Sequence, residues 1–149
     1  MEVLDTVRAV LAQKGTAIWS VTPDATVYDA IALMAAKNIG AVLVMDHDRL
    51  VGMLSERDYT RKVILVGKQS KETSVEEIMS TNLTTVAPFD TVDRCMHLMT
   101  EHRVRHLPVI EVDRVVGVVS IGNLVNWIIS AQGAALHNME RMLGAEYPG

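Results

Sequence analysis

Two short stretches of this chain carry polar side chains at a spacing that suits a phosphorylated ligand rich in hydroxyl groups. In the first, Gly52 opens a short apolar run, Ser55 stands where a helix would begin, and Asp58 follows one turn later. The stretch from Gly117 to Asn123 repeats this order. Backbone N–H groups at a helix start attract anions, and Ser, Asp and Asn side chains can bond both backbone and ligand. The alternative is that both stretches are only N-caps, but repetition of the whole context favours a binding role.

The composition favours one folded, intracellular unit. Of the 149 residues, 49% are hydrophobic and only 4% aromatic, which indicates a core of aliphatic side chains, Met and Ala. No apolar run approaches the roughly 18 residues that cross a bilayer. Residues 1–14 include Glu2 and Asp5 and predict a short amphipathic helix instead of a signal peptide, so we expect a cytoplasmic protein. The single cysteine, Cys95, excludes an intramolecular disulfide and is expected in the core.

The charge distribution indicates that any anion is held locally. The formal net charge is -4, which disfavours nucleic acid as a partner. Basic candidates flank the two repeated stretches, although solvated helix faces explain scattered charges more often than ligands do. These candidates are Arg57, Arg61, Lys62, Arg103, Arg105 and His106.

The hydrophobic pattern predicts the order β-α-β-β-α twice. In the first copy we expect strands over 17–21, 41–45 and 50–54, a helix from Thr26 to about Asn38 that Gly40 ends, and a helix from Ser55 through Val66. A polar linker and a capping box at Ser74 follow. In the second copy we expect strands over 83–86, 107–110 and 115–119, and helices starting at Thr91 and Ser120. A further helix is expected over 134–143, with fraying over 145–149.

The two copies align without a gap at an offset of 65 residues. Identical pairs include Pro23/Pro88, Thr26/Thr91, Gly52/Gly117 and Ser55/Ser120, which are turn and cap positions. Such a duplication predicts two repeats, 10–67 and 73–130, followed by a C-terminal helix and tail over 131–149. We expect the repeats to pack about a pseudo-two-fold axis with two related clefts between them.

These motifs resemble the CBS domain, named after cystathionine β-synthase. The resemblance rests on residues 22–30, 38–44 and 52–58 in the first copy, and on 91–92, 103–109 and 117–123 in the second. It implies an α/β (α+β) tandem pair, or Bateman module, that forms a disc-shaped homodimer through its helices. It also implies a regulatory protein without catalytic activity that binds AMP, ADP, ATP or NAD and signals to a partner protein. The alternative is a constitutive interaction scaffold with vestigial nucleotide sites.

The resemblance also implies which side chains line each cleft. One cleft would contain Met53, Ser55, Arg57, Asp58, Ser80, Thr84, Val104, Arg105 and His106. The related cleft would contain Thr16, Trp19, Ile39, Gly40, Val118, Ser120 and Asn123. Asp58 would accept hydrogen bonds from the ribose hydroxyls, Met53 and Val104 would contact adenine, and Arg105 and His106 would meet phosphate. Because Asn123 replaces the acidic residue, we expect the Asp58 cleft to bind more tightly.

Other interpretations of conspicuous residues are weaker. His102 and His106 lie four residues apart but lack a nearby third ligand, so no metal site is expected. Burial of Trp127 is favoured over ligand stacking, whereas Trp19 can stack on adenine or simply pack. The chain lacks a Gly-rich phosphate loop with Lys and a nucleophile elbow, so no enzymatic activity is expected.

Overall fold

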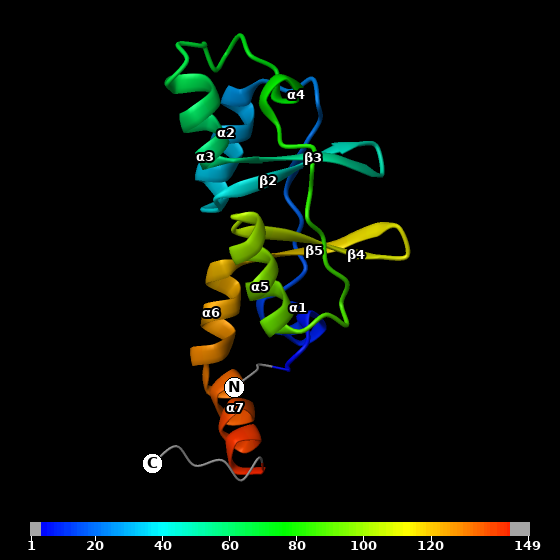
Figure 1. The fold of residues 1–149 in the computed structure, drawn as a ribbon. Helices are drawn as coiled ribbons and strands as arrows, with labels where there is room; N and C mark the ends of the chain where they lie inside the picture. The colour runs from blue at the N-terminus through cyan, green and yellow to red at the C-terminus, as the bar shows by residue number, and fades with distance from the viewer. Residues whose placement is uncertain (1–3, 144–149) are drawn as a thin grey trace. The chain divides into compact units, whose positions relative to one another are not determined.

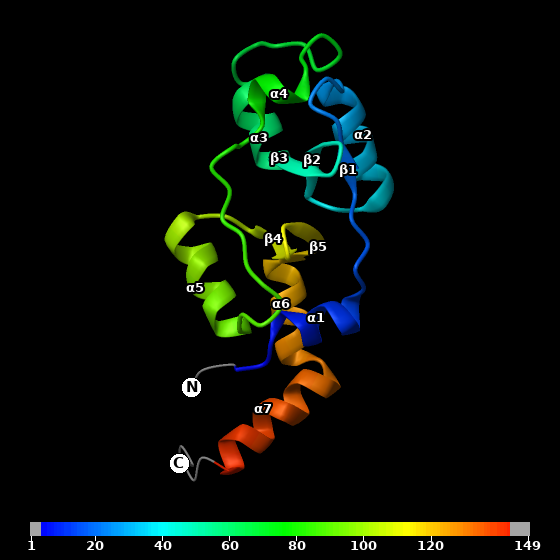
Figure 2. The ribbon, with the colours of Figure 1, turned by 90° about the vertical axis from the view of Figure 1, so that its right-hand side faces the viewer.

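The computed structural model describes residues 4–143, with the side chains of 131–134, 136 and 137 excepted. Its fold is mixed α+β, as the sequence predicted, and its elements are shown in Figures 1 and 2. The chain forms two compact units. The first-repeat unit contains Ala17–Thr84 with Val112–Val116, and the second-repeat unit contains the chain up to Thr16, Thr85–Glu111 and the chain from Gly117 onward. The fraying predicted for 145–149 lies outside the described residues.

The first-repeat unit places helices against a three-stranded sheet in the order β1-β2-β3. Strand β1 pairs with β2 in parallel, and β2 pairs with β3 antiparallel. The elements are β1 (Ser20–Val21), α2 (Val27–Lys37), β2 (Ala41–Asp46), β3 (Arg49–Ser55), α3 (Glu56–Tyr59), η1 (Thr60–Ile64) and α4 (Val75–Ile78). Their shared core consists of Val27, Ala30, Met34, Val42, Val44, Leu54, Val63, Val75 and Ile78.

The helix ends in this unit agree with the prediction in part. Helix α2 ends at about Asn38, as predicted, but the residue that caps it is the left-handed Asn38 itself (φ 54°) and not Gly40. Asn tolerates this conformation, and its N–H bonds the carbonyls of the last turn. The helix that starts after Ser55 ends at Ile64 and not at Val66. Its last turn is a wider π-turn, in which Leu65 N–H donates to the Thr60 carbonyl.

The second-repeat unit packs helices around a two-stranded sheet, β4-β5. Its elements are α1 (Val7–Lys14), α5 (Val92–His102), β4 (His106–Glu111), β5 (Arg114–Ser120), α6 (Ile121–Ile129) and α7 (Ala131–Leu143). Cys95 and Trp127 are both fully buried, as predicted. The Trp127 indole Nε1–H donates to Asp5 Oδ2 at 2.7 Å, which satisfies its buried donor and attaches the chain ahead of α1 to α6.

The first strand of each repeat is shorter than predicted. The strand expected over 17–21 contains only Ser20 and Val21, because the Thr22-Pro23 turn ends it and pairing starts where Leu43 N–H donates to the Trp19 carbonyl. The strand expected over 83–86 is a single bridge between Val86 and Val109. Pro108 holds the position that Leu43 holds in the first copy, and proline has no N–H to donate.

The short helix at the start of each repeat packs on the opposite repeat. Helix α4 lies at the start of the second repeat in sequence, yet Val75 N–H donates to the Ala25 carbonyl and Val27 N–H to the Thr73 carbonyl. Residues ahead of the first repeat make the equivalent bonds in the second-repeat unit, where Val7 N–H donates to Asp90 and Val92 N–H to Asp5. The compact units are therefore interleaved along the chain, whereas the boundaries 10–67, 73–130 and 131–149 follow the sequence and stay a prediction.

Candidate functional site

A reciprocal cap places the carboxylate of Asp58 at the junction of β3 and α3. Ser55, the last residue of β3, has extended backbone, and its Oγ accepts from Asp58 N–H at 3.2 Å. In return, Asp58 Oδ2 accepts from Ser55 N–H at 2.9 Å and from Ser55 Oγ–H at 3.0 Å. This capping box satisfies backbone donors that the helix leaves unpaired and holds the carboxylate in one orientation.

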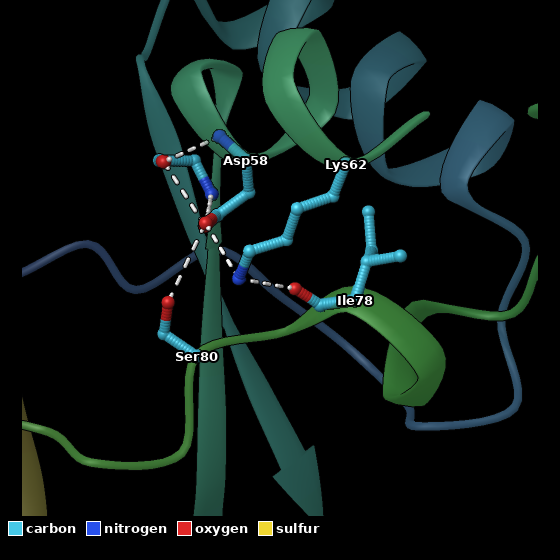
Figure 3. Close-up of polar contacts among 5 residues, drawn as sticks. Asp58, Lys62, Ile78 and Ser80 are labelled. Carbon is cyan, nitrogen blue, oxygen red and sulfur yellow. Dashed lines mark hydrogen bonds and ion pairs between the residues drawn. The ribbon is translucent and has the colours of Figure 1, made fainter. Parts of the chain in front are cut away.

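The second carboxylate oxygen, Asp58 Oδ1, faces side chains outside the cap. Lys62 Nζ lies 3.1 Å from it, and Ser80 Oγ lies 3.5 Å away. Figure 3 shows that Lys62 reaches this oxygen from the turn after Asp58, whereas Ser80 comes from the segment after α4. The Asp58 side chain is only 14% exposed, so its charge depends on these nearby donors.

Ser80 reaches Asp58 because the chain after α4 pairs with β3. Met53 N–H donates to the Ser80 carbonyl at 3.0 Å, and Ser80 N–H donates back to Met53 at 2.9 Å. A Cβ at Gly52 would lie 2.5 Å from Met79 Sδ and 3.0 Å from the Ser80 carbonyl oxygen. The glycine that opens the motif therefore allows the close approach of this segment.

The second copy repeats the cap but not its surroundings. Asn123 Oδ1 accepts from Ser120 N–H at 2.8 Å, and Asn123 N–H donates to Ser120 Oγ at 3.1 Å. At the sequence offset of 65, Trp127 occupies the position of Lys62 and Gly15 that of Ser80. A Cβ at Gly117 would lie 2.8 Å from a Leu11 methyl group of α1, so this glycine also accommodates a close neighbour. The two copies thus share a helix cap and differ in the groups around it.

The remaining predicted residues are divided between the two units. The first-repeat unit holds Trp19, Ile39, Gly40, Met53, Ser55, Arg57, Asp58, Ser80 and Thr84, and the second-repeat unit holds Thr16, Val104, Arg105, His106, Val118, Ser120 and Asn123. Within the first-repeat unit, the structure brings Ser55, Asp58 and Ser80 together. The assembly of each cleft from both repeats stays a prediction.

Gly40, Arg105 and His106 make local contacts that affect the predicted sites. The carbonyl of Gly40 accepts from Glu56 N–H, and that of Arg105 accepts from Ile121 N–H, so both fix the helix that follows each cap. Burial, and then the charge of Arg105, lowers the pKa of His106, which favours the neutral imidazole. A neutral imidazole is a weaker phosphate partner than a cation, so Arg105 is the stronger of the two predicted phosphate partners.

Trp19 lies at the edge of the first-repeat unit with one ring face covered. Lys37 Nζ lies 4.2 Å from the centroid of its ring, and the side chain is 38% exposed. A cation at this distance is attracted to the ring face. Stacking of Trp19 on adenine stays a prediction, and Lys37 takes up one of its two faces.

The role of Lys62 was missed at the sequence level. Lys62 was considered only as a basic residue that could bind an anion, whereas in the structure it bonds Asp58 and the Ile78 carbonyl. An Asp four residues ahead of a Lys in a helix was a usable signal, because such side chains lie on the same face. The Ile78 carbonyl had no such signal, since its position depends on the docking of α4.

Two classes of site are not found among the residues that the structure describes. No group of three or more His, Cys, Asp or Glu side chains in residues 4–143 is placed to hold a metal ion. Within the same range, no helix is long and apolar enough to cross a membrane.

Comparison with known proteins identifies the repeats. The CBS domain family matches residues 15–64 and 75–130. A mitochondrial CBS domain-containing protein of Arabidopsis thaliana is 39% identical over 138 residues, which cover 89% of this chain and 66% of the plant protein. The match thus spans just under two thirds of that relative. Because that relative is mitochondrial, the cytoplasmic location of this chain stays a prediction.

Solved structures show the same fold. A protein with CBS domains from Burkholderia ambifaria, described as a candidate for signal transduction, is 50% identical with a TM-score of 0.83, over 85% of this chain and 96% of that one. A CBS domain pair in complex with 5′-methylthioadenosine and S-adenosyl-L-methionine is 23% identical with a TM-score of 0.71, over 81% and 97% of the two chains. With both halves of the duplication matched, the chain belongs to the CBS domain family and contains two copies of the domain.

Proposed function

We propose that this chain is a regulatory protein that binds an adenosyl ligand, namely AMP, ADP, ATP or NAD, and signals its presence to a partner protein. The observation that carries this proposal is the unequal use of the two Asp58 oxygens. The helix cap uses Oδ2, whereas Oδ1 contacts the side chains of Lys62 and Ser80, both of which can move away. A ribose hydroxyl can therefore donate to Oδ1 without breaking the cap.

The proposed ligand also needs apolar and basic contacts. In our proposal, Met53 and Val104 contact adenine, and Arg105 binds phosphate with Arg57 nearby. His106 would act as a neutral hydrogen-bonding group, because burial lowers its pKa. The site around Ser120 and Asn123 would bind more weakly, since an amide lacks the charge that strengthens a bond to ribose. The adenosyl compounds held by a protein of the same fold agree with this ligand class.

The sharpest test exchanges the residues that distinguish the two caps. Asp58→Asn should keep the cap, because Asn123 makes the same capping bonds in the second copy. With the amide oxygen used by the cap, the amide nitrogen would stand at the position of Oδ1, where it cannot accept from a ribose hydroxyl. A charge-assisted bond would therefore be lost, and affinity for AMP should fall by roughly tenfold or more. Isothermal titration of wild type and variant with AMP, ADP and NAD measures this, and unchanged affinity would refute the Asp58 assignment.

Two further variants serve as controls for that titration. Asn123→Asp should add charge at the second site and tighten binding there, without altering the cap. Asp58→Ala removes both the charge and the cap, so it should also lower the free energy of unfolding by about 0.5 to 2 kcal/mol. Comparing Asp58→Ala with Asp58→Asn separates loss of folding from loss of binding.

We propose no catalytic role for the chain, and we infer that signalling acts through a homodimer. Exposed apolar side chains recur at four-residue intervals on α6, namely Ile121, Val125 and Ile129. Residues at this spacing form one stripe on a helix, and such a stripe suits a second copy of the same surface. Ligand binding can transmit a signal only if the ligand has different affinities for two states of this assembly.

A scaffold with vestigial sites is the second candidate, and one observation favours it. Ser120 and Asn123 show that the motif can serve as a helix cap without an acidic group, so Ser55 and Asp58 do not by themselves require a ligand. Absorbance of the purified protein at 260 nm, and analysis of compounds released on heating, distinguishes the candidates. A bound adenosyl compound supports the sensor, whereas protein that is ligand-free and unresponsive to added nucleotide supports the scaffold.

A further inference from the structure

The ammonium group of Lys62 bridges the candidate ribose carboxylate and the backbone after α4. Its Nζ lies 3.1 Å from Asp58 Oδ1 and donates to the Ile78 carbonyl at 3.0 Å. Figure 3 shows the lysine side chain extending between these two oxygens, with Ser80 on the other side of the carboxylate. Lys62 therefore uses the same carboxylate oxygen that the capping box leaves for a ligand.

The position of Lys62 follows from the local helix geometry. Asp58 and Lys62 are four residues apart, which places their side chains on one face. The Lys62 side chain is 44% exposed and that of Asp58 only 14%, so the ion pair is partly accessible to solvent. A group that approaches Oδ1 from solvent must share the oxygen with this ammonium or displace it.

The second copy lacks this arrangement because both charged partners are replaced. Asn123 stands at the position of Asp58, and Trp127 at that of Lys62. Trp127 is fully buried and donates its indole N–H to Asp5 instead of pointing toward the cap. The lysine therefore accompanies the acidic form of the motif, where a charge has to be balanced.

We propose that Lys62 is an affinity-determining residue that competes with the ligand's ribose for Asp58. This inference rests on the proposed adenosyl site and deepens it. Lys62 Nζ contacts Oδ1 and connects it to the Ile78 carbonyl. When a ribose hydroxyl donates to Oδ1, the ammonium withdraws, and the bond that links η1 to the Ile78 carbonyl is lost. Ligand binding is thereby coupled to the segment that leads from α4 toward the second repeat.

The expected effect is modest because the ion pair is partly exposed. Partly exposed ion pairs such as Lys62–Asp58 are weak. Removing the Lys62 ammonium should therefore tighten ribose binding by roughly two- to fivefold. Adenosine is the appropriate probe, since it carries ribose and adenine but no phosphate that would itself attract the lysine. Lys62→Met keeps most of the length of the side chain and removes the charge, whereas Lys62→Arg keeps the charge.

The test is titration of the full chain and its variants with adenosine at two salt concentrations. Raising the salt from about 0.1 M to about 1 M shortens the screening length from about 10 Å to about 3 Å and weakens the Lys62–Asp58 pair. The difference in adenosine affinity between wild type and Lys62→Met should therefore become smaller at high salt. Lys62→Met should be tighter than wild type at low salt, and Lys62→Arg should behave like wild type.

The outcomes separate this inference from the proposed function. Weaker or unchanged adenosine binding by Lys62→Met, with binding still lost in Asp58→Asn, would refute the competition and leave the ribose site in place. Unchanged binding by Asp58→Asn would refute the site itself. If wild type binds no adenosine and Lys62→Met does, competition is supported, and if neither binds adenosine, the competition is refuted, and the titration with AMP decides the proposed site. Thermal unfolding of each variant checks that the fold is intact.

Discussion

At the scale of single residues, one local geometry serves two environments. Ser55 with Asp58 and Ser120 with Asn123 form the same reciprocal cap, because carboxylate and amide oxygens both accept from a backbone N–H. The difference lies in the second oxygen of Asp58, which carries charge and attracts Lys62. The aspartate can therefore support a helix and still offer an acceptor to a ligand.

Cys95 provides a test of the core at the same scale. Its side chain is fully buried, and desolvation followed by the charge of Asp90 raises the pKa of its thiol to about 12. The pKa of the Cys95 thiol is higher in the folded than in the unfolded protein. The neutral buried thiol therefore contributes to the free energy of unfolding below about pH 9, and this contribution is lost as the pH rises toward 12. The native thiol should also resist alkylation until the protein unfolds.

Urea unfolding of wild type and Cys95→Ala at about pH 8 and about pH 10 measures this linkage. Wild type should lose more stability than the variant between the two pH values, by up to about 1.4 kcal/mol per pH unit. Equal losses in both proteins, or rapid alkylation of the native chain, would contradict the buried thiol. The variant also controls for the lysines and tyrosines that titrate in the same range.

At the scale of elements, each core is completed by a helix from outside its repeat. Val75 and Ile78 of α4 are buried with α2, β2 and β3 of the first repeat. Val7, Val10 and Leu11 of α1 are buried in the second-repeat unit. The start of the second repeat therefore contributes to the first core.

Fragments of the chain should reveal this dependence. Residues 17–84 should unfold cooperatively in urea, whereas residues 17–72, which lack α4, should unfold earlier or without a sharp transition. The loss of two buried aliphatic side chains removes about 1.5 to 3 kcal/mol each, from a total stability of only about 5 to 15 kcal/mol. A peptide of residues 73–84 added in excess should restore the transition. Equal midpoints for both fragments would show that α4 is dispensable.

At the scale of the whole molecule, exposed apolar side chains indicate an association surface. Besides the stripe on α6, Met139, Met142 and Leu143 of α7 are exposed. A helix over 134–143 was predicted and is confirmed, and its expected apolar side included Leu136, whose side chain lies outside the described residues. Exposed apolar surface that is contiguous and large marks interaction sites, so these side chains favour an association surface on α6 and α7.

Light scattering of two altered chains tests the proposed homodimer. Val125→Lys places a charge in the α6 stripe and should weaken the dimer by about tenfold or more, because a buried unpaired charge is costly. A chain that ends at Ser130 removes α7 and should also shift the equilibrium toward monomer. Val112→Lys makes the same change at a valine that is 88% exposed between β4 and β5, outside α6 and α7, and provides a matched control for Val125→Lys. A full chain that is monomeric, or dimers unaffected by both changes, would contradict the proposal.

The sequence by itself determined the duplication, the helix caps and most strands, because these depend on residues close together in the chain. The pairs Thr26/Thr91 and Ser55/Ser120 predicted caps that the structure contains. Only the tertiary structure showed that α4 and α1 pack on opposite repeats, and that Pro108 leaves a single bridge at Val86. These features depend on contacts between distant segments, which local patterns do not encode.

The same distinction applies to the candidate site. Residue types and spacing were enough to identify Ser55, Asp58 and the weaker acceptor Asn123. Tertiary packing decided which groups face Asp58, since Ser80 arrives by pairing with Met53 and the Ile78 carbonyl by the docking of α4. The sequence thus determined that the two repeats differ in charge, and the fold decided that Lys62 balances this charge.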